Sequence, residues 1–181
     1  MQLALRTGPQ DLAALRDDLN ALIKQINAGA PGLINAQGGS VGSSAGGTDD
    51  TLFSYQFAAN DFATMFPTSG GLSGFRMTGW VTTAANANNK RCKLFLGATT
   101  LIDTGAVALN NGAMFLEAIM LRTGVSTQKL IGRAVQGTTL IASSVQDGAL
   151  DETTALLARI TGNTGTLNDV LGKGFMIEAL R

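Results

Sequence analysis

The chain has 181 residues, enough for one domain and a short appendage, and its 13 Lys and Arg residues balance 13 Asp and Glu residues. Zero net charge argues against nucleic-acid binding, and the chain lacks both the roughly 18-residue apolar run of a membrane helix and the apolar segment of a secretory signal. With no histidine and one cysteine, Cys92, the chain excludes Ser-His-Asp and Cys-His catalysis, histidine or cysteine-cluster metal sites and an intrachain disulfide. We therefore expect a non-enzymatic structural or binding protein without a cofactor or metal, and with no nucleic acid or membrane as partner.

Residues 11–28 carry the heptad pattern of a short coiled coil. Large apolar residues recur at alternating spacings of three and four, and Pro9 and Gly29 suit the two ends of a helix. Ile23 widens the apolar face, which favours three or more helices over two. The alternative is a helix packed against its own domain. The predicted oligomerisation seam consists of Leu12, Leu15, Leu19, Leu22, Ile23 and Ile26.

The next segment, residues 31–50, is rich in Gly and Ser and predicts a linker. It would separate an N-terminal anchor and oligomerisation helix, residues 1–30, from a β-domain that spans residues 51–181.

Beyond residue 50 the apolar residues alternate with a period of two, which is typical of half-buried strands. Turn residues divide this region, for example Asn86–Asn89, Asn110–Gly112, Asp147-Gly148 and Gly162–Gly165, together with 67–71. With no convincing helix between the strands, the pattern predicts a mainly β fold, an antiparallel β-sandwich of the jelly-roll type. The expected strands cover residues 53–57, 75–82, 92–97, 113–122, 128–136, 138–145, 154–162 and 173–181.

Two features of these strands bear on association. Residues 113–121 are apolar on both faces, which indicates a strand covered either by another subunit or by a loop of the same chain. Trp80 is the sole tryptophan and is interpreted either as an interface residue or as an exposed platform for a sugar ring. Cys92 alternates with leucines and is expected to be a buried small hydrophobe.

Motifs that could carry chemistry are weak. Residues 42–46 match the G-x-S-x-G pattern, but no following helix is expected and no histidine can act as base. Residues 172–174 echo a phosphate-binding loop without its first glycine or its Ser/Thr. A hydrolytic carboxylate pair or a calcium site would draw on the remaining acidic residues. These are Asp49, Asp50, Glu117, Asp147, Asp151, Glu152 and Glu178, of which Glu117 and Glu178 are expected to pair with Lys or Arg across the sheet.

Several stretches resemble a family of small tailed-bacteriophage virion proteins. They are TLFSYQF (51–57), GFRMTGWVTTAANANNKRCKLFLG (74–97) and the strand ending LRTG (121–124), with RTGP (6–9) leading into the seam. The resemblance covers most of residues 50–136 and the first helix. It implies a homotrimer with a helical bundle at one end and a β-sandwich at the other, as in head-fibre and capsid decoration (cement) proteins. The family brings no catalytic motif, so no site residue is carried over.

The resulting hypothesis is a trimeric capsid decoration or head-fibre protein, attached through its N-terminal segment. It would lie on the capsid surface after assembly in the host cytoplasm, with the major capsid protein or other virion proteins as partners. The alternatives are a tail-fibre or host-glycan-binding module and a small carboxylate hydrolase.

Overall fold

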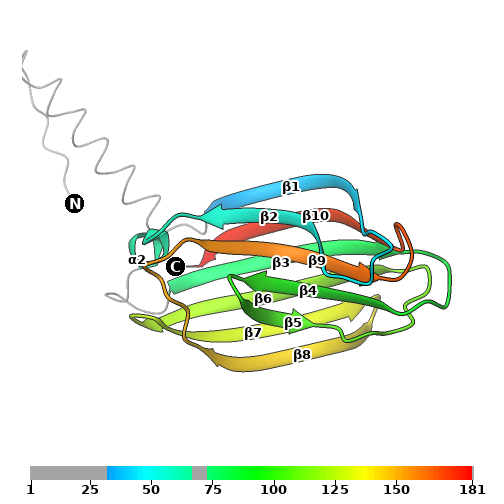
Figure 1. Cartoon of the computed structure of the whole chain (residues 1–181). Helices are drawn as coiled ribbons and strands as arrows, with labels where there is room; N and C mark the ends of the chain where they lie inside the picture. The colour runs from blue at the N-terminus through cyan, green and yellow to red at the C-terminus, as the bar shows by residue number, and fades with distance from the viewer. Residues whose placement is uncertain (1–31, 67–72, 181) are drawn as a thin grey trace, which may run out of the picture.

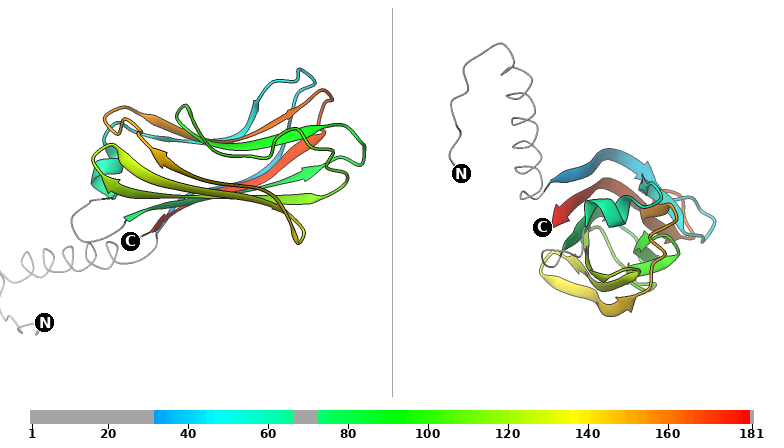
Figure 2. Two further views of the ribbon diagram at one scale, coloured as in Figure 1. Left: turned by 90° about the horizontal axis from the view of Figure 1, so that it is seen from below. Right: turned by 90° about the vertical axis from the view of Figure 1, so that its left-hand side faces the viewer.

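The computed structural model describes residues 32–66 and 73–180, and these form two antiparallel β-sheets that pack face to face (Figures 1 and 2). The six-stranded sheet consists, in spatial order, of β1 (Leu33–Gly42), β10 (Val170–Leu180), β3 (Ser73–Thr83), β6 (Ala113–Gly124), β7 (Thr127–Gln136) and β8 (Thr139–Gly148). The four-stranded sheet consists of β2 (Asp50–Phe57), β9 (Leu156–Thr164), β4 (Lys90–Leu96) and β5 (Thr99–Asp103).

The chain crosses repeatedly between the two sheets. Strands β1, β3, β6 and β10 belong to one sheet and β2, β4, β5 and β9 to the other, which is the order of a jelly roll. The hairpin β7–β8 extends the first sheet beyond β6. The predicted mainly β, antiparallel fold is confirmed. In the described part of the chain, no helix has the length and hydropathy needed to cross a bilayer.

Four buried phenylalanines fill one end of the core. The rings of Phe57, Phe62, Phe66 and Phe75 lie with neighbouring centroids 4.8–5.9 Å apart. Phe62 comes from the short helix α2 (Asp61–Met65), which lies across this end of the sandwich (Figure 1). Aromatic packing of this kind stabilises the core through area burial and edge-to-face contacts.

A buried lysine organises loops at the opposite end of the sheets. Lys90 is fully buried, and its ammonium group donates to the backbone and side-chain oxygens of Asn86, at 3.0 and 2.7 Å, and to the Asn88 carbonyl at 3.0 Å. The two asparagine side chains donate in turn to the carboxylate of Asp169, at 2.7 and 2.9 Å. The N-x-N-x-K stretch of the sequence therefore joins the β3–β4 loop to the β9–β10 loop.

The prediction of a linker at residues 31–50 is wrong for residues 33–42, because Leu33–Gly42 is the edge strand β1. The register of β1 against β10 shifts at Leu33/Asn35 and again at Gly38/Val41. These shifts and the small residues of β1 remove the apolar alternation that marks a strand in sequence. Residues 33–42 thus belong to the β-sandwich.

Smaller differences concern strand ends. Thr99–Asp103 forms β5, which the periodicity of the sequence does not predict, because five residues with a register shift opposite Leu94/Phe95 carry little alternation. The predicted turns at Asp147-Gly148 and Gly162–Gly165 are wrong in part, since β8 ends at Gly148 and β9 at Thr164. The predicted helix of residues 1–30, its seam and the turn at 67–71 lie outside the described residues.

Cys92 lies on the inner face of β4 and has no exposed surface, which confirms its interpretation as a buried small hydrophobe. Burial raises the pKa of its thiol to about 12. We expect a thiol-specific reagent to label Cys92 only as fast as the protein opens, because the reactive thiolate is both inaccessible and suppressed. The labelling rate should therefore rise with denaturant in parallel with unfolding. Complete labelling of the folded protein within the mixing time would contradict this expectation.

Candidate interaction surface

The outer face of the six-stranded sheet carries side chains in rows, because register partners lie side by side on neighbouring strands. One row, named here the aromatic row, consists of Trp80, Phe115, Val135 and Leu140 on β3, β6, β7 and β8. Trp80 is 39% exposed and Leu140 58% exposed, while the two residues between them are half-buried. The row is a continuous apolar strip across four strands.

A second strip, the branched row, crosses the same sheet. It consists of Ile119, Ile131 and Val145 on β6, β7 and β8. Ile131 is 42% exposed and Val145 79% exposed. Exposed β-branched and aromatic side chains in contiguous rows are unusual on a monomer and typical of an association surface.

Charged residues on this face are paired with one another. Glu178 on β10 accepts a 2.6 Å ion pair from Arg76 on β3, and Arg76 approaches Glu117 on β6 at 3.9 Å. Glu117 also pairs with Arg133 on β7 at 2.7 Å. The expected cross-strand pairing of Glu117 and Glu178 is confirmed, and the hydrogen bond to Glu178 raises the pKa of Arg76. Two cations and two carboxylates thus neutralise one another within the surface.

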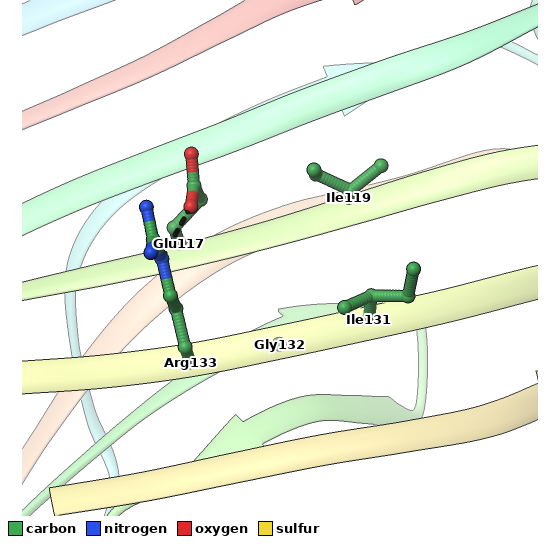
Figure 3. A pocket seen from close by; sticks show the side chains of 5 residues that line it. All are labelled: Glu117, Ile119, Ile131, Gly132 and Arg133. Carbon is green, nitrogen blue, oxygen red and sulfur yellow. Dashed lines mark hydrogen bonds and ion pairs between the residues drawn. The ribbon is translucent and has the colours of Figure 1, made fainter. Parts of the chain in front are cut away.

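A shallow depression lies where the charges meet the branched row. Its lining consists of Glu117, Ile119, Ile131, Gly132 and Arg133 (Figure 3). The ion pair lies at one side of this depression and the two isoleucines at the other (Figure 3). The depression therefore offers an apolar wall and paired charges, which suit packing against another surface.

Trp80 lies over Gly174 of β10. A Cβ atom at position 174 would lie 2.1 Å from the indole ring, so the glycine is required for this placement of the ring. The indole packs on bare backbone and keeps part of its surface open to solvent.

We expect Gly174→Ala to displace the Trp80 ring and to lower the free energy of unfolding by about 1–3 kcal/mol, the usual cost of overpacking. Because Trp80 is the sole tryptophan, its emission should shift to longer wavelength as the ring becomes more exposed. Gly38→Ala is the matched control, since its added Cβ would meet no atom closer than 4.0 Å. Equal effects of the two substitutions on emission would contradict the assigned contact.

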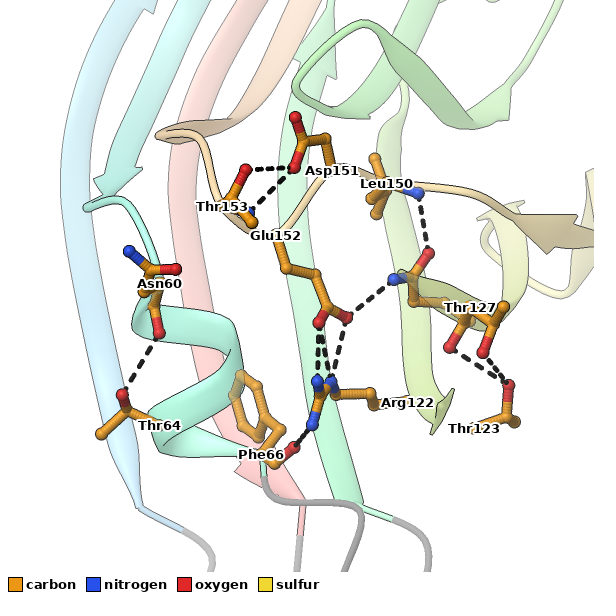
Figure 4. A network of polar contacts seen from close by, with 11 residues as sticks. Asn60, Thr64, Phe66, Arg122, Thr123, Thr127, Leu150, Asp151, Glu152 and Thr153 are labelled. Carbon is orange, nitrogen blue, oxygen red and sulfur yellow. Dashed lines mark hydrogen bonds and ion pairs between the residues drawn. The ribbon is translucent and has the colours of Figure 1, made fainter. Parts of the chain in front are cut away.

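Glu152, one of the predicted acidic candidates, is locked in a buried network (Figure 4). Arg122, 6% exposed, forms a 2.8 Å ion pair with Glu152, 4% exposed, and donates to the Phe66 carbonyl at 3.0 Å. Gln128 adds a hydrogen bond to Glu152 at 2.8 Å. Burial by itself would raise the pKa of Glu152, but the bonds from Arg122 and Gln128, with one from the Ser126 backbone, outweigh it and lower that pKa. The arginine of the LRTG stretch is therefore structural.

Three further acidic candidates are held by separate local contacts. Asp151 sits on an exposed turn where hydrogen bonds from Thr153 lower its pKa, and Asp147 pairs with Lys129. Asp49 accepts an ion pair of 2.5 Å from Lys93. Among residues 32–66 and 73–180, no group of three or more acidic or sulfur side chains is placed to hold a metal ion.

The two weak motifs are also resolved by their contacts. In the G-x-S-x-G stretch, the Ser44 backbone and hydroxyl both donate to the Asp50 carboxylate, at 2.7 and 2.8 Å. This arrangement is a contact between the β1–β2 loop and the first residue of β2. Lys173 lies in β10 and donates to the Ser40 hydroxyl at 2.9 Å.

Sequence reasoning found Trp80 and the apolar β6 but missed the rows, which depend on register between distant strands. No protein-family model matches the chain, and no curated protein matches it. Among solved structures, it is similar to the CBM2 module of the evolved Dit of Lactobacillus casei BL23 phage J-1. The identity is 10%, the TM-score is 0.35, and the match covers 69% of this chain and 67% of that chain. A likeness at this level assigns neither a function nor a ligand.

Proposed function

We propose that this chain is a non-enzymatic structural protein of a tailed-bacteriophage virion that assembles as a homotrimer. It decorates the capsid, or forms a head fibre, and attaches to the major capsid protein or a neighbouring virion protein through residues 1–30. The resemblance of its sequence to small virion proteins supports this proposal. The outer face of the six-stranded sheet, with its apolar rows and self-neutralised charges, is the observation that carries it.

The physical reasoning concerns desolvation. An association surface gains by covering apolar side chains, at roughly 25 cal/mol per Å² of apolar area, and loses when it buries charges without partners. On this face Trp80, Ile131 and Val145 are exposed to solvent, and the ion-paired charges of the same face already have partners. Covering the face therefore buries apolar surface without burying a charge that lacks an ion-pair partner.

The proposal is tested on purified virions of the phage that encodes the chain. Quantitative mass spectrometry should find many copies in each particle, and head fractions should retain them. Paired substitutions Ile131→Asp and Val145→Asp should lower the copy number, whereas Gln56→Asp on the exposed outer edge of β2 should not. Absence of the chain from particles would overturn the proposal.

A second candidate function is a tail-fibre or host-glycan-binding module, favoured by the Trp80 ring that lies on Gly174 and is 39% exposed. A flat aromatic surface suits the apolar face of a sugar ring. Under this alternative the virion would hold few copies, located at the tail, and host-surface glycans would change Trp80 fluorescence. Under the leading proposal the emission responds to self-association and is unaffected by glycans.

A further inference from the structure

Arg159 differs from the other arginines of the described residues in having no carboxylate partner. The remaining four, Arg76, Arg91, Arg122 and Arg133, each form an ion pair. Arg159 lies on β9, between β2 and β4 in the four-stranded sheet, on the sheet opposite to the aromatic and branched rows (Figure 1).

The guanidinium group of Arg159 is held in place by an aromatic ring. Its central carbon lies 4.5 Å from the centroid of Phe95, the register partner on β4. The Lys93 ammonium lies 5.5 Å from the same ring. Phe95 is only 7% exposed as a result. Stacking fixes the plane of the guanidinium and leaves its terminal nitrogens to act as donors.

Hydrogen-bonding capacity is left unused around this arginine. Arg159 Nε is buried without a partner, and so is the Thr161 hydroxyl two residues along the same face of β9. Buried polar atoms without partners are uncommon in folded proteins, and each one calls for an explanation.

The charge of this face is also unbalanced. Three cations, Arg91, Lys93 and Arg159, accompany two carboxylates. Both carboxylates are engaged, because Asp103 pairs with Arg91 and Asp49 pairs with Lys93. Asp103 is held ionised by the Arg91 hydrogen bond, which lowers its pKa. One positive charge, that of Arg159, remains without a counter-charge.

We propose that the outer face of the four-stranded sheet binds a carboxylate side chain of an acidic protein segment, with the guanidinium group of Arg159 as the contact. A planar, pre-oriented guanidinium presents two parallel donors that match the two oxygens of a carboxylate. A protein segment fits better than a sugar, because Phe95 is covered and offers no open ring for stacking. This proposal is independent of the proposed function, since it concerns the opposite sheet and assumes neither trimers nor a virion.

The experiment titrates the full chain, labelled with ¹⁵N, with the blocked tripeptide Ac-Glu-Glu-Glu-NH₂ at low ionic strength. Backbone amide signals of residues 158–162, Ser54 and Phe95 should shift in a saturable manner, and added salt should weaken the effect. The neutral tripeptide Ac-Gln-Gln-Gln-NH₂ should shift none of them.

Three variants make the test specific. Arg159→Gln should abolish the shifts. Arg159→Lys keeps the charge but loses the two parallel donors of the guanidinium, so it should weaken binding several-fold. Arg133→Gln, on the other sheet, should leave them unchanged. If Arg159→Gln fails to fold, the Arg159→Lys comparison decides.

Four results would overturn the proposal: no saturable shift with the glutamate peptide, equal shifts with both peptides, full binding by Arg159→Lys, or shifts in folded Arg159→Gln. Shifts produced by glucuronate but not by the glutamate peptide would overturn the choice of a protein segment as the occupant.

Discussion

Arg122→Met is expected to lower the free energy of unfolding by about 3–5 kcal/mol, because it leaves the Glu152 carboxylate buried without its counter-charge. Both side chains are at most 6% exposed, and the guanidinium also supplies the hydrogen bond to the Phe66 carbonyl. The substitution thus removes the Arg122 donor from two acceptors, the Glu152 carboxylate and the Phe66 carbonyl, next to the phenylalanine end of the core. Chemical denaturation followed by circular dichroism measures the loss.

Arg133→Met is the matched control for this experiment. Its ion pair with Glu117 has the same chemistry, but the Arg133 side chain is 60% exposed. We expect a loss of less than about 1 kcal/mol, the usual range for a surface pair. Equal losses for the two variants would show that burial does not set the strength of the Arg122 pair.

The pH dependence of the same pair has a defined sign. Because the net effect of its hydrogen bonds lowers the pKa of Glu152 in the folded protein, the stabilisation is fully present above the unfolded-state pKa of this group. It is lost as the pH falls through the lower pKa of the folded state. Arg122→Met removes the hydrogen bond and charge of Arg122, which help to lower that pKa, while the burial that raises it remains, so the difference in stability from the unaltered protein should narrow in acid. A gap that widens in acid would contradict this assignment.

The second large effect concerns the edge strand β1. A chain of residues 32–181 should keep the β-sheet signal and a cooperative melt, whereas residues 48–181 should lose about 5 kcal/mol or more of stability. The shorter chain loses the backbone hydrogen bonds between β1 and β10, each contributing about 0.5–1.5 kcal/mol net. It also loses the fully buried Ser43, whose backbone N–H donates to the Val170 carbonyl at 2.9 Å.

Thermal melts of the two truncated chains, measured side by side, provide the check. Removal of β1 also opens the backbone of β10 as a new edge, so the shorter chain should aggregate at concentrations where the longer one does not. If residues 48–181 melt at the same temperature as residues 32–181, β1 does not stabilise the β-sandwich, and the interpretation of this segment as a linker is supported.

The sequence predicted what periodicity encodes. Alternation marked β2, β3 and β4, because one face of each lies in the core, whereas length and apolar or β-branched content marked β6 and β7. Alternation could not mark β1, where glycines and shifted register erase the pattern, nor the five-residue β5. Ion pairs between residues far apart in the sequence could not be predicted, for a different reason. Arg122 meets Glu152 of the β8–β9 loop, and Arg76 meets Glu178 of β10, only after folding brings together residues that are 30 and 102 positions apart.

The candidate surface shows the same division. The apolar residues on both faces of β6 were visible in sequence and predicted a strand covered either by another subunit or by a loop of the same chain. Whether another subunit covers them stays a prediction, as does the seam from Leu12 to Ile26. The unpaired state of Arg159 was invisible, because a sequence does not show which carboxylates neighbouring cations use.

Light scattering on the full chain, coupled to size-exclusion chromatography at micromolar concentration, tests self-association most directly. We expect a particle three times the 18.6 kDa mass of the chain. Ile131→Asp with Val145→Asp should dissociate or weaken this particle, while Gln56→Asp should leave it intact. A stable monomer of 18.6 kDa for the unaltered chain would contradict the proposed homotrimer.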